Sequence, residues 1–138
     1  MPFEPASAPD ILDIAATAGR AAIEATRRGL PISALDALME TGRLTPAEID
    51  RIVLPRKTLA HRRALGVLTA DQSDRLMRVA HVVAAAEDTF GSRDKAHRWL
   101  RRPTTALDGD APLDWLDTSE GARQVERLLE RIDHGLAA

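Results

Sequence analysis

The sequence has no cysteine and no tyrosine, and only 3% of its residues are aromatic. Without cysteine, disulfide scaffolds and thiolate-ligated zinc or iron–sulfur sites are excluded, which agrees with a reducing compartment. No run approaches the roughly 20 apolar residues that span a bilayer, and the start, MPFEPASAPD, lacks the features of a secretory signal. We therefore expect a soluble, cytoplasmic protein without a membrane partner.

β-Strand patterns are lacking as well. No segment alternates in valine, isoleucine or aromatic residues as a half-buried strand requires, whereas alanine, leucine and arginine recur at helical spacing. The sequence therefore predicts an all-α fold. Its 138 residues suit one domain, or two small helical subdomains that share a core.

An alanine-rich apolar stripe runs through residues 10–29. This stretch ends in basic residues and Gly29, as helix ends commonly do, and it predicts one continuous helix. The stripe consists of Ile11, Ile14, Ala15, Ala18, Ala22 and Ala25. Because small side chains allow another helix to approach closely, residues 1–30 are a candidate dimerisation segment. Packing onto the chain's own core is the alternative.

Three further short helices are expected in residues 31–65. Ser33 is the expected N-cap of the first. Thr45 and Glu48 form a capping box that starts the second, with a proline at the first helical position. Pro55 interrupts that helix and opens the third at its first turn.

The second half predicts one long helix and two shorter ones. Thr69 and Gln72 make another capping box, which starts the longest helix and the spine of the core. Its apolar stripe consists of Leu76, Val79, Ala80, Val83, Ala86 and Phe90. Ser92 starts a shorter helix, and the acidic segment 104–117 then shows no helical periodicity apart from a turn at PLDWL. Thr118 is the expected cap of the last helix. The apolar stripe of that helix is Val125, Leu128, Leu129, Ile132 and Leu136.

Five basic residues and no acidic residue lie from Arg51 to Arg63, in a chain whose formal net charge is −2. Such a run is often no more than a solvated helix face. Here it completes the order short helix, tight turn, capped helix and basic helix, which is typical of a helix-turn-helix. We expect residues 55–64 to enter the major groove and residues 45–53 to brace them. The candidate DNA-binding residues are Arg56, Lys57, Thr58, His61, Arg62 and Arg63. For His61, helix packing is an equal alternative.

Four spaced motifs occupy the region from about residue 64 to residue 136. They are SDRLMR at 73–78, AHRWL at 96–100, PLDWLDTSEG at 112–121 and VERLLERIDHG at 125–135. These motifs resemble the toxin-binding domain of the Xre/MbcA/ParS family of antitoxins, and residues 31–63 look like the helix-turn-helix of that family. Two positions differ from the family pattern: Thr104, where asparagine is common, and Asp108, where a Gly-Gly pair is usual.

The resemblance implies a type II antitoxin that binds and inhibits a RES-domain toxin, an enzyme that consumes NAD or transfers ADP-ribose from it. It also implies binding to operator DNA, with repression of the antitoxin's own operon, and a homodimer. Three regions are expected: a tail and helix at 1–30, the helix-turn-helix at 31–65 and the toxin-binding domain at 66–138. In the family the C-terminal region covers the entrance to the toxin's active site. The residues expected to bind the toxin are Trp115, Leu116, Asp117, Glu126, Arg127, Glu130, Arg131 and Asp133.

No catalytic, cofactor or metal site is predicted, because His81 and His97 lie sixteen residues apart without a second ligand at a metal-like spacing. The pattern around Trp99 favours core filling over a role as an interface anchor, whereas Trp115 fits both equally. The alternative function is a stand-alone helix-turn-helix regulator without a toxin partner. Such a regulator would share the basic helix but would give no reason for the motifs at 112–121 and in the last helix. A small enzyme would need a polar catalytic pocket that the sequence does not show.

Overall fold

The computed structural model describes residues 11–12 and 19–137, and the regular elements within these ranges are all helical, as predicted. In chain order they are α2 (Arg20–Arg28), α3 (Ile32–Glu40), α4 (Pro46–Ile52), α5 (Arg56–Leu65), α6 (Ala70–Phe90), α7 (Arg93–Arg101), the 3-10 turns η1 (Thr105–Leu107) and η2 (Pro112–Trp115), and α8 (Ser119–Ala137). Within the same ranges, no helix is long and apolar enough to cross a membrane.

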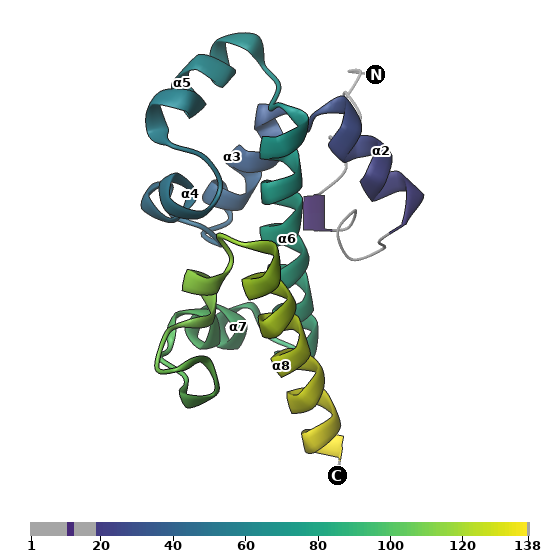
Figure 1. The fold of residues 1–138 in the computed structure, drawn as a ribbon, viewed down its shortest axis with the longest axis vertical. Helices are drawn as coiled ribbons and strands as arrows, with labels where there is room; N and C mark the ends of the chain where they lie inside the picture. The colour runs from purple at the N-terminus through teal and green to yellow at the C-terminus, as the bar shows by residue number, and fades with distance from the viewer. Residues whose placement is uncertain (1–10, 13–18, 138) are drawn as a thin grey trace, which may run out of the picture.

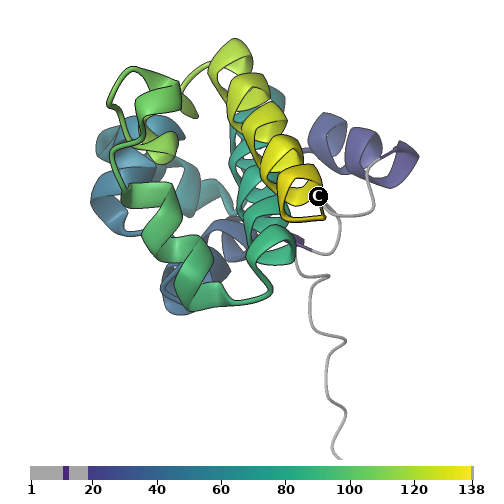
Figure 2. The same ribbon diagram turned by 90° about the horizontal axis from the view of Figure 1, so that it is seen from below.

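Helix α6 runs through the middle of the fold, as Figure 1 shows. It begins at the predicted capping box, in which the backbone N–H of Gln72 donates to the hydroxyl of Thr69 and the backbone N–H of Thr69 donates to Oε1 of Gln72. Its buried residues are Ser73, Leu76, Met77, Val79, Ala80, Val82, Val83 and Ala86. Helices α2, α7 and α8 all pack against it (Figures 1 and 2). Helix α5 and the C-terminus lie at opposite ends of the long axis.

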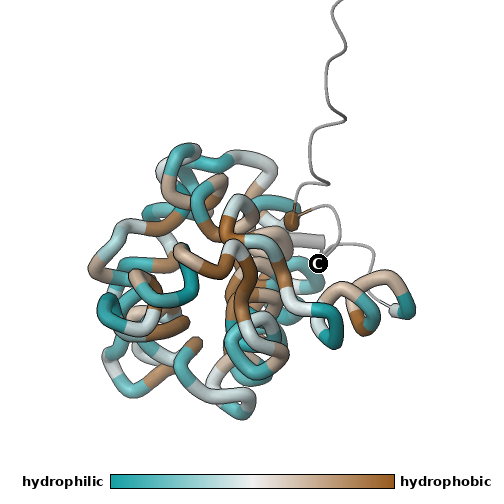
Figure 3. Tube along the Cα trace, turned by 90° about the horizontal axis from the view of Figure 1, so that it is seen from above, coloured by the Kyte–Doolittle hydropathy of each residue, from teal (hydrophilic) through white to brown (hydrophobic). Residues whose placement is uncertain are grey.

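The core is continuous across the helices. Figure 3 shows the hydrophobic positions gathered toward the middle of the bundle. In α7, Trp99 is buried and its ring centroid lies 5.5 Å from that of Phe90, so this tryptophan fills the core. In α8, Val125 and Leu129 are buried with only 0% and 2% of their surfaces exposed. One hydrophobic core therefore includes side chains from both halves of the chain.

The helix predicted across residues 10–29 is interrupted. Gly19 has φ +84° and ψ −152°, which lies outside the helical region, and α2 begins only at Arg20. The sequence prediction followed the apolar stripe and missed this break, because a glycine inside a helical pattern does not by itself reveal a positive φ. Three predicted stripe members, Ile14, Ala15 and Ala18, lie outside the described residues.

The start of α3 also differs from the prediction. Pro31 occupies the N-cap position, and no side chain caps this end. Ser33 is the second helical residue and is exposed, so it does not serve as the cap. Proline fits here because its fixed φ matches the extended backbone observed at this position, φ −67° and ψ 150°.

The segment between α7 and α8 is more ordered than predicted. The turn at PLDWL is present as η2, but η1 was not predicted. Asp108 has φ +56° and is followed by Gly109 at φ +85°. Aspartate tolerates this left-handed backbone better than most residues other than glycine, which is why Asp108 can occupy this position. Thr118 caps α8 as predicted, since its hydroxyl accepts from the backbone N–H of Gly121 at 3.0 Å.

Candidate functional surfaces

The first candidate surface begins at the turn between α3 and α4. Gly42 has φ +76°, and the backbone N–H groups of Arg43 and Leu44 both donate to the carbonyl oxygen of Leu38, at 3.0 and 3.1 Å. Leu44 is buried and ties the turn to the core. Helix α4 then starts with the predicted capping box of Thr45 and Glu48. Two short helices joined by a tight glycine turn have the form of a helix-turn-helix.

Helix α5, which carries the predicted DNA-binding residues, contains no buried residue. Its start is fixed by Asp50, whose Oδ1 accepts from the backbone N–H of Arg56 at 2.7 Å. Only Leu59 packs partly against the core. The side chains of Arg56, Lys57 and His61 are exposed, and that of Thr58 is half-buried. These four residues therefore lie on one exposed helix. The other two residues expected to contact DNA, Arg62 and Arg63, are instead hydrogen-bonded within the protein.

The guanidinium groups of Arg62 and Arg63 are already bound within the protein. Nε of Arg62 donates to the carbonyl oxygen of Val67 at 2.8 Å. Arg63 forms a two-pronged pair with Asp36 of α3, at 2.9 and 2.7 Å, and this hydrogen bonding raises the pKa of Arg63. The sequence predicted both arginines as DNA contacts because nothing in the pattern of α5 shows that Val67 and Asp36 bind them.

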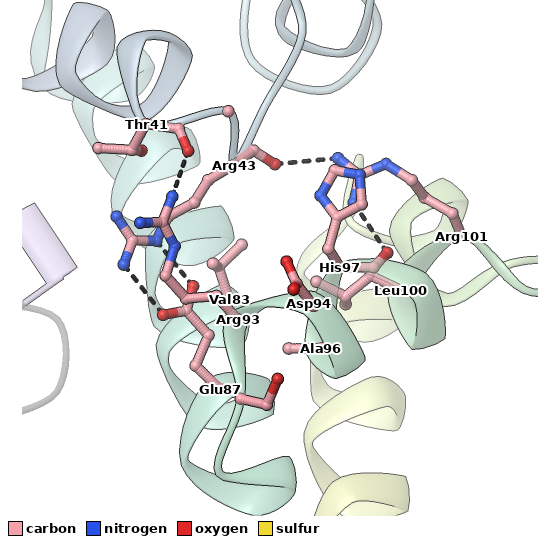
Figure 4. Close-up of a pocket in the computed structure, with 12 residues that line it drawn as sticks. Thr41, Arg43, Val83, Glu87, Arg93, Asp94, Ala96, His97, Leu100 and Arg101 are labelled. Carbon is pink, nitrogen blue, oxygen red and sulfur yellow. Dashed lines mark hydrogen bonds and ion pairs between the residues drawn. The ribbon is translucent and has the colours of Figure 1, made fainter.

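A junction of arginines joins the helix-turn-helix to α7, and sequence reasoning missed it. Arg43 of the turn forms a two-pronged pair with Glu87 of α6, at 2.7 and 3.0 Å. Arg93 at the start of α7 donates to the carbonyl oxygen of Thr41. Figure 4 shows these groups around a polar cavity of about 490 Å³. Asp94 lines the same cavity.

A second two-pronged pair in this junction joins Arg101 of α7 to Glu48 of α4. Nη2 and Nε of Arg101 lie 2.7 and 3.0 Å from the two carboxylate oxygens, and Nη2 also donates to the carbonyl oxygen of Arg43 at 2.9 Å. Burial alone would raise the pKa of Glu48. Hydrogen bonds from Arg101 and Thr45 lower it by more than burial raises it, so the pKa of Glu48 lies below its ordinary value. The partners are 53 residues apart, so no local sequence pattern could reveal the pair.

The second candidate surface comprises α8 and the acidic segment before it. Arg127, Glu130, Arg131 and Asp133 are exposed, and Glu126 is half-buried. Of these, Asp133 accepts a hydrogen bond from the hydroxyl of Thr89 at 3.1 Å, and Glu126 lies 3.7 Å from Nε2 of His81. The structure therefore places all five of these predicted residues on α8, with the first three directed to solvent without a described ion pair.

The three predicted residues of the acidic segment, Trp115, Leu116 and Asp117, differ in exposure. Asp117 is exposed, and Trp115 is half-buried with its Nε1 donating to Asp110 at 3.0 Å. Leu116 is 0% exposed and packs in the core, so it supports this surface from beneath. A groove of about 390 Å³ runs beside Trp115, and its lining includes Asp114. Leu136 is the last member of the apolar stripe predicted for this helix, and its side chain lies outside the described residues.

Comparison with known proteins divides the chain at the middle of α6. A model of the antitoxin Xre-like helix-turn-helix domain matches residues 21–81. A model of the antitoxin Xre/MbcA/ParS C-terminal toxin-binding domain matches residues 85–135. Together the two matches define the class of protein, an antitoxin with an N-terminal helix-turn-helix and a C-terminal toxin-binding domain.

Individual proteins that this chain is similar to are also named as antitoxins. Antitoxin Xre of Pseudomonas putida is 44% identical over 108 residues, which cover 78% of this chain and 67% of the relative. Antitoxin Xre of Photorhabdus laumondii is 35% identical over 113 residues, covering 80% and 76%. The Prs ADP-ribosylating antitoxin of Sphingobium is 35% identical over 80 residues, covering 51% and 50%. The chain belongs to the Xre/MbcA/ParS family of type II antitoxins.

Proposed function

We propose that this antitoxin neutralises a RES-domain toxin that consumes NAD or transfers ADP-ribose, and that it represses its own operon by binding operator DNA as a homodimer. The observation that carries the proposal is the arrangement of one exposed basic helix and one exposed mixed-charge helix face at separate places on a single core. A relative named Prs ADP-ribosylating antitoxin supports an ADP-ribosylating partner. In this proposal the chemistry belongs to the toxin, and the antitoxin acts by binding.

The toxin-binding part of the proposal rests on α8. Its inner face is held in the core by residues such as Val125 and Leu129, so its outer face is presented on a rigid support. That outer face alternates Arg127, Glu130 and Arg131, which suits a polar protein surface. The groove beside Trp115 adds an aromatic residue whose ring is partly accessible. We place the toxin against these two features.

A pair of charge-reversal variants tests this placement. The double variant Arg127→Glu and Arg131→Glu should fail to protect cells that express the neighbouring toxin, because reversed charges at an interface repel the partner's complementary groups. The matched control, Arg56→Glu with Lys57→Glu on α5, makes the same change in net charge and should still protect. The toxin that copurifies with the wild-type chain should consume NAD when released. Protection by the α8 variant, with its fold intact by circular dichroism, would contradict the placement.

The DNA-binding part of the proposal rests on α5. Arg56 and Lys57 are exposed cations without an ion pair among the described residues, so they can neutralise phosphates. Replacing both with glutamine should weaken binding to the duplex upstream of the operon. It should also reduce the slope of log K against log salt by about 1.8, since each lost phosphate contact removes about 0.9. A control with Lys95→Gln and Arg98→Gln on α7 removes the same charge elsewhere and should keep the slope.

A further inference from the structure

The chain between α2 and α3 lies against the chain between α5 and α6. The backbone N–H of Leu68 donates to the carbonyl oxygen of Leu30 at 2.9 Å, and the N–H of Ile32 donates to the carbonyl oxygen of Gly66 at 3.1 Å. The N–H of Leu30 donates to the hydroxyl of buried Ser73 at 2.7 Å. These bonds fix the two connections to each other and to α6.

Gly29 shows how closely the two connections approach. It has φ +90°, and a Cβ atom at this position would lie 2.3 Å from the carbonyl oxygen of Leu68. Only glycine meets both conditions without a shift of the backbone. The C-terminal end of α2 is thereby held next to the segment that follows α5, and Figure 1 shows both helix ends at the upper end of α6.

This arrangement brings cations from two helices to one end of the molecule. Arg27 and Arg28 occupy the last turn of α2, and both are exposed without an ion-pair partner among the described residues. The guanidinium of Arg62 folds back onto the same connection, where Nε meets the carbonyl oxygen of Val67. The acidic residues on α2, α3 and the start of α6 have other roles: Glu24 lies 3.9 Å from Arg20, Asp36 pairs with Arg63, and Asp71 complements the dipole in the first turn of α6.

The simplest role for Arg27 and Arg28 is to offset the dipole at the end of α2. The end of α2 that carries them is held against the segment that follows α5, and the proposed function assigns α5 to DNA. We propose that Arg27 and Arg28 form a second phosphate-binding element, so that DNA is held by the end of α2 as well as by α5. The inference rests on the proposed DNA binding and adds a second helix to it.

The test measures how DNA affinity of the full chain depends on salt. The probe is the duplex upstream of the operon, titrated at several salt concentrations. The double variant Arg27→Gln and Arg28→Gln should lower the slope of log K against log salt by about 1.8 and reduce affinity roughly sixty-fold at about 0.1 M salt, because two phosphate contacts are lost. The variant Arg27→Lys and Arg28→Lys keeps both charges and should retain most of the slope. A role confined to the helix dipole would change thermal stability without changing the slope.

Two controls separate the possible outcomes. The α7 variant, Lys95→Gln with Arg98→Gln, should keep the wild-type slope, and an equal loss in that variant would mean that only net charge matters and would overturn the proposal. An unchanged slope in the Arg27 and Arg28 glutamine variant would overturn it as well. The α5 variant, Arg56→Gln with Lys57→Gln, tests the proposed function separately. If the slope is kept in the α5 variant but falls in the α2 variant, the α5 assignment fails while the α2 assignment stands.

Discussion

Helices α5 and α6 follow each other in the chain, yet they are held in opposite ways. Helix α6 buries eight of its 21 residues, whereas α5 buries none of its ten. What fixes α5 is the hydrogen bond that the backbone N–H of Arg56 donates to Asp50 at its start, the left-handed Gly66 at its end and the partial burial of Leu59. The residue types in α6 are therefore constrained by packing, and most of those in α5 are not.

This difference indicates which residues are explained by packing and which need another explanation. A short helix that buries no residue gains little from packing, and the exposed cations at its start, Arg56 and Lys57, make no described ion pair that would explain them by stability. The arginines at the junction with α7 are the opposite case, since the side chains of Arg43 and Arg101 are only 16% and 24% exposed and both pair with carboxylates. The described basic residues thus include some that hold the fold and others, such as Arg56 and Lys57, that are exposed to solvent.

The largest effect should come from the core of α6. Leu76 is 0% exposed, so Leu76→Ala should lower the free energy of unfolding by about 2–5 kcal/mol through lost burial and the cavity left behind. Leu65 at the end of α5 is 55% exposed, and Leu65→Ala should change stability by no more than about 0.5 kcal/mol. Urea unfolding of both variants measures the contrast. Equal losses would mean that α5 is held more firmly than its exposure indicates.

Breaking the junction should have the next largest effect. Arg101→Met leaves the carboxylate of Glu48 with only 13% of its side chain exposed and without its charged partner, and should cost about 1.5–3 kcal/mol. Arg98→Met on the same helix removes an exposed cation without a described partner and should cost almost nothing. A double-mutant cycle with Glu48→Gln, followed by thermal unfolding, isolates the pair. Additive effects would show that the pair contributes no coupling energy.

How far the sequence predicts the fold depends on the distance between interacting groups. The capping boxes at Thr45 and Thr69 were predicted correctly because both partners lie within four residues of each other. The cap at Thr118 was predicted for the same reason. The break at Gly19 was missed, since the apolar stripe continues across it and a single glycine does not fix its own φ.

The candidate surfaces were less predictable than the helices. The basic character of α5 is visible in the sequence, but the use of Arg62 and Arg63 inside the protein is not, because Asp36 lies 27 residues from Arg63. The pair of Arg43 and Glu87 spans 44 residues. Long-range pairs of this kind follow from the packing of helices and leave no periodic signal in the sequence.

Acid should weaken the junction between Glu48 and Arg101. The pKa of Glu48 lies below its ordinary value of 4.5, because the folded state favours the charged carboxylate. Its contribution to stability is therefore complete above about 4.5 and is lost as the pH falls through the lower, folded-state pKa. Unfolding measured from neutral pH down to acid should show a smaller loss in Glu48→Gln than in the wild type. Identical pH profiles would show that other carboxylates govern acid unfolding.

Breaking the exposed pair of Arg63 and Asp36 should affect stability less than breaking the junction pair. Their side chains are 42% and 32% exposed, so Asp36→Asn should cost no more than about 1 kcal/mol. The same change removes one negative charge and releases Arg63, which should strengthen DNA binding and steepen the salt slope by about 0.9 if Arg63 then reaches a phosphate. Adding Arg63→Ala to Asp36→Asn should reverse the gain in slope. A salt slope that stays at the wild-type value in Asp36→Asn would place Arg63 outside the DNA surface and would leave α5 with Arg56 and Lys57 as its phosphate contacts.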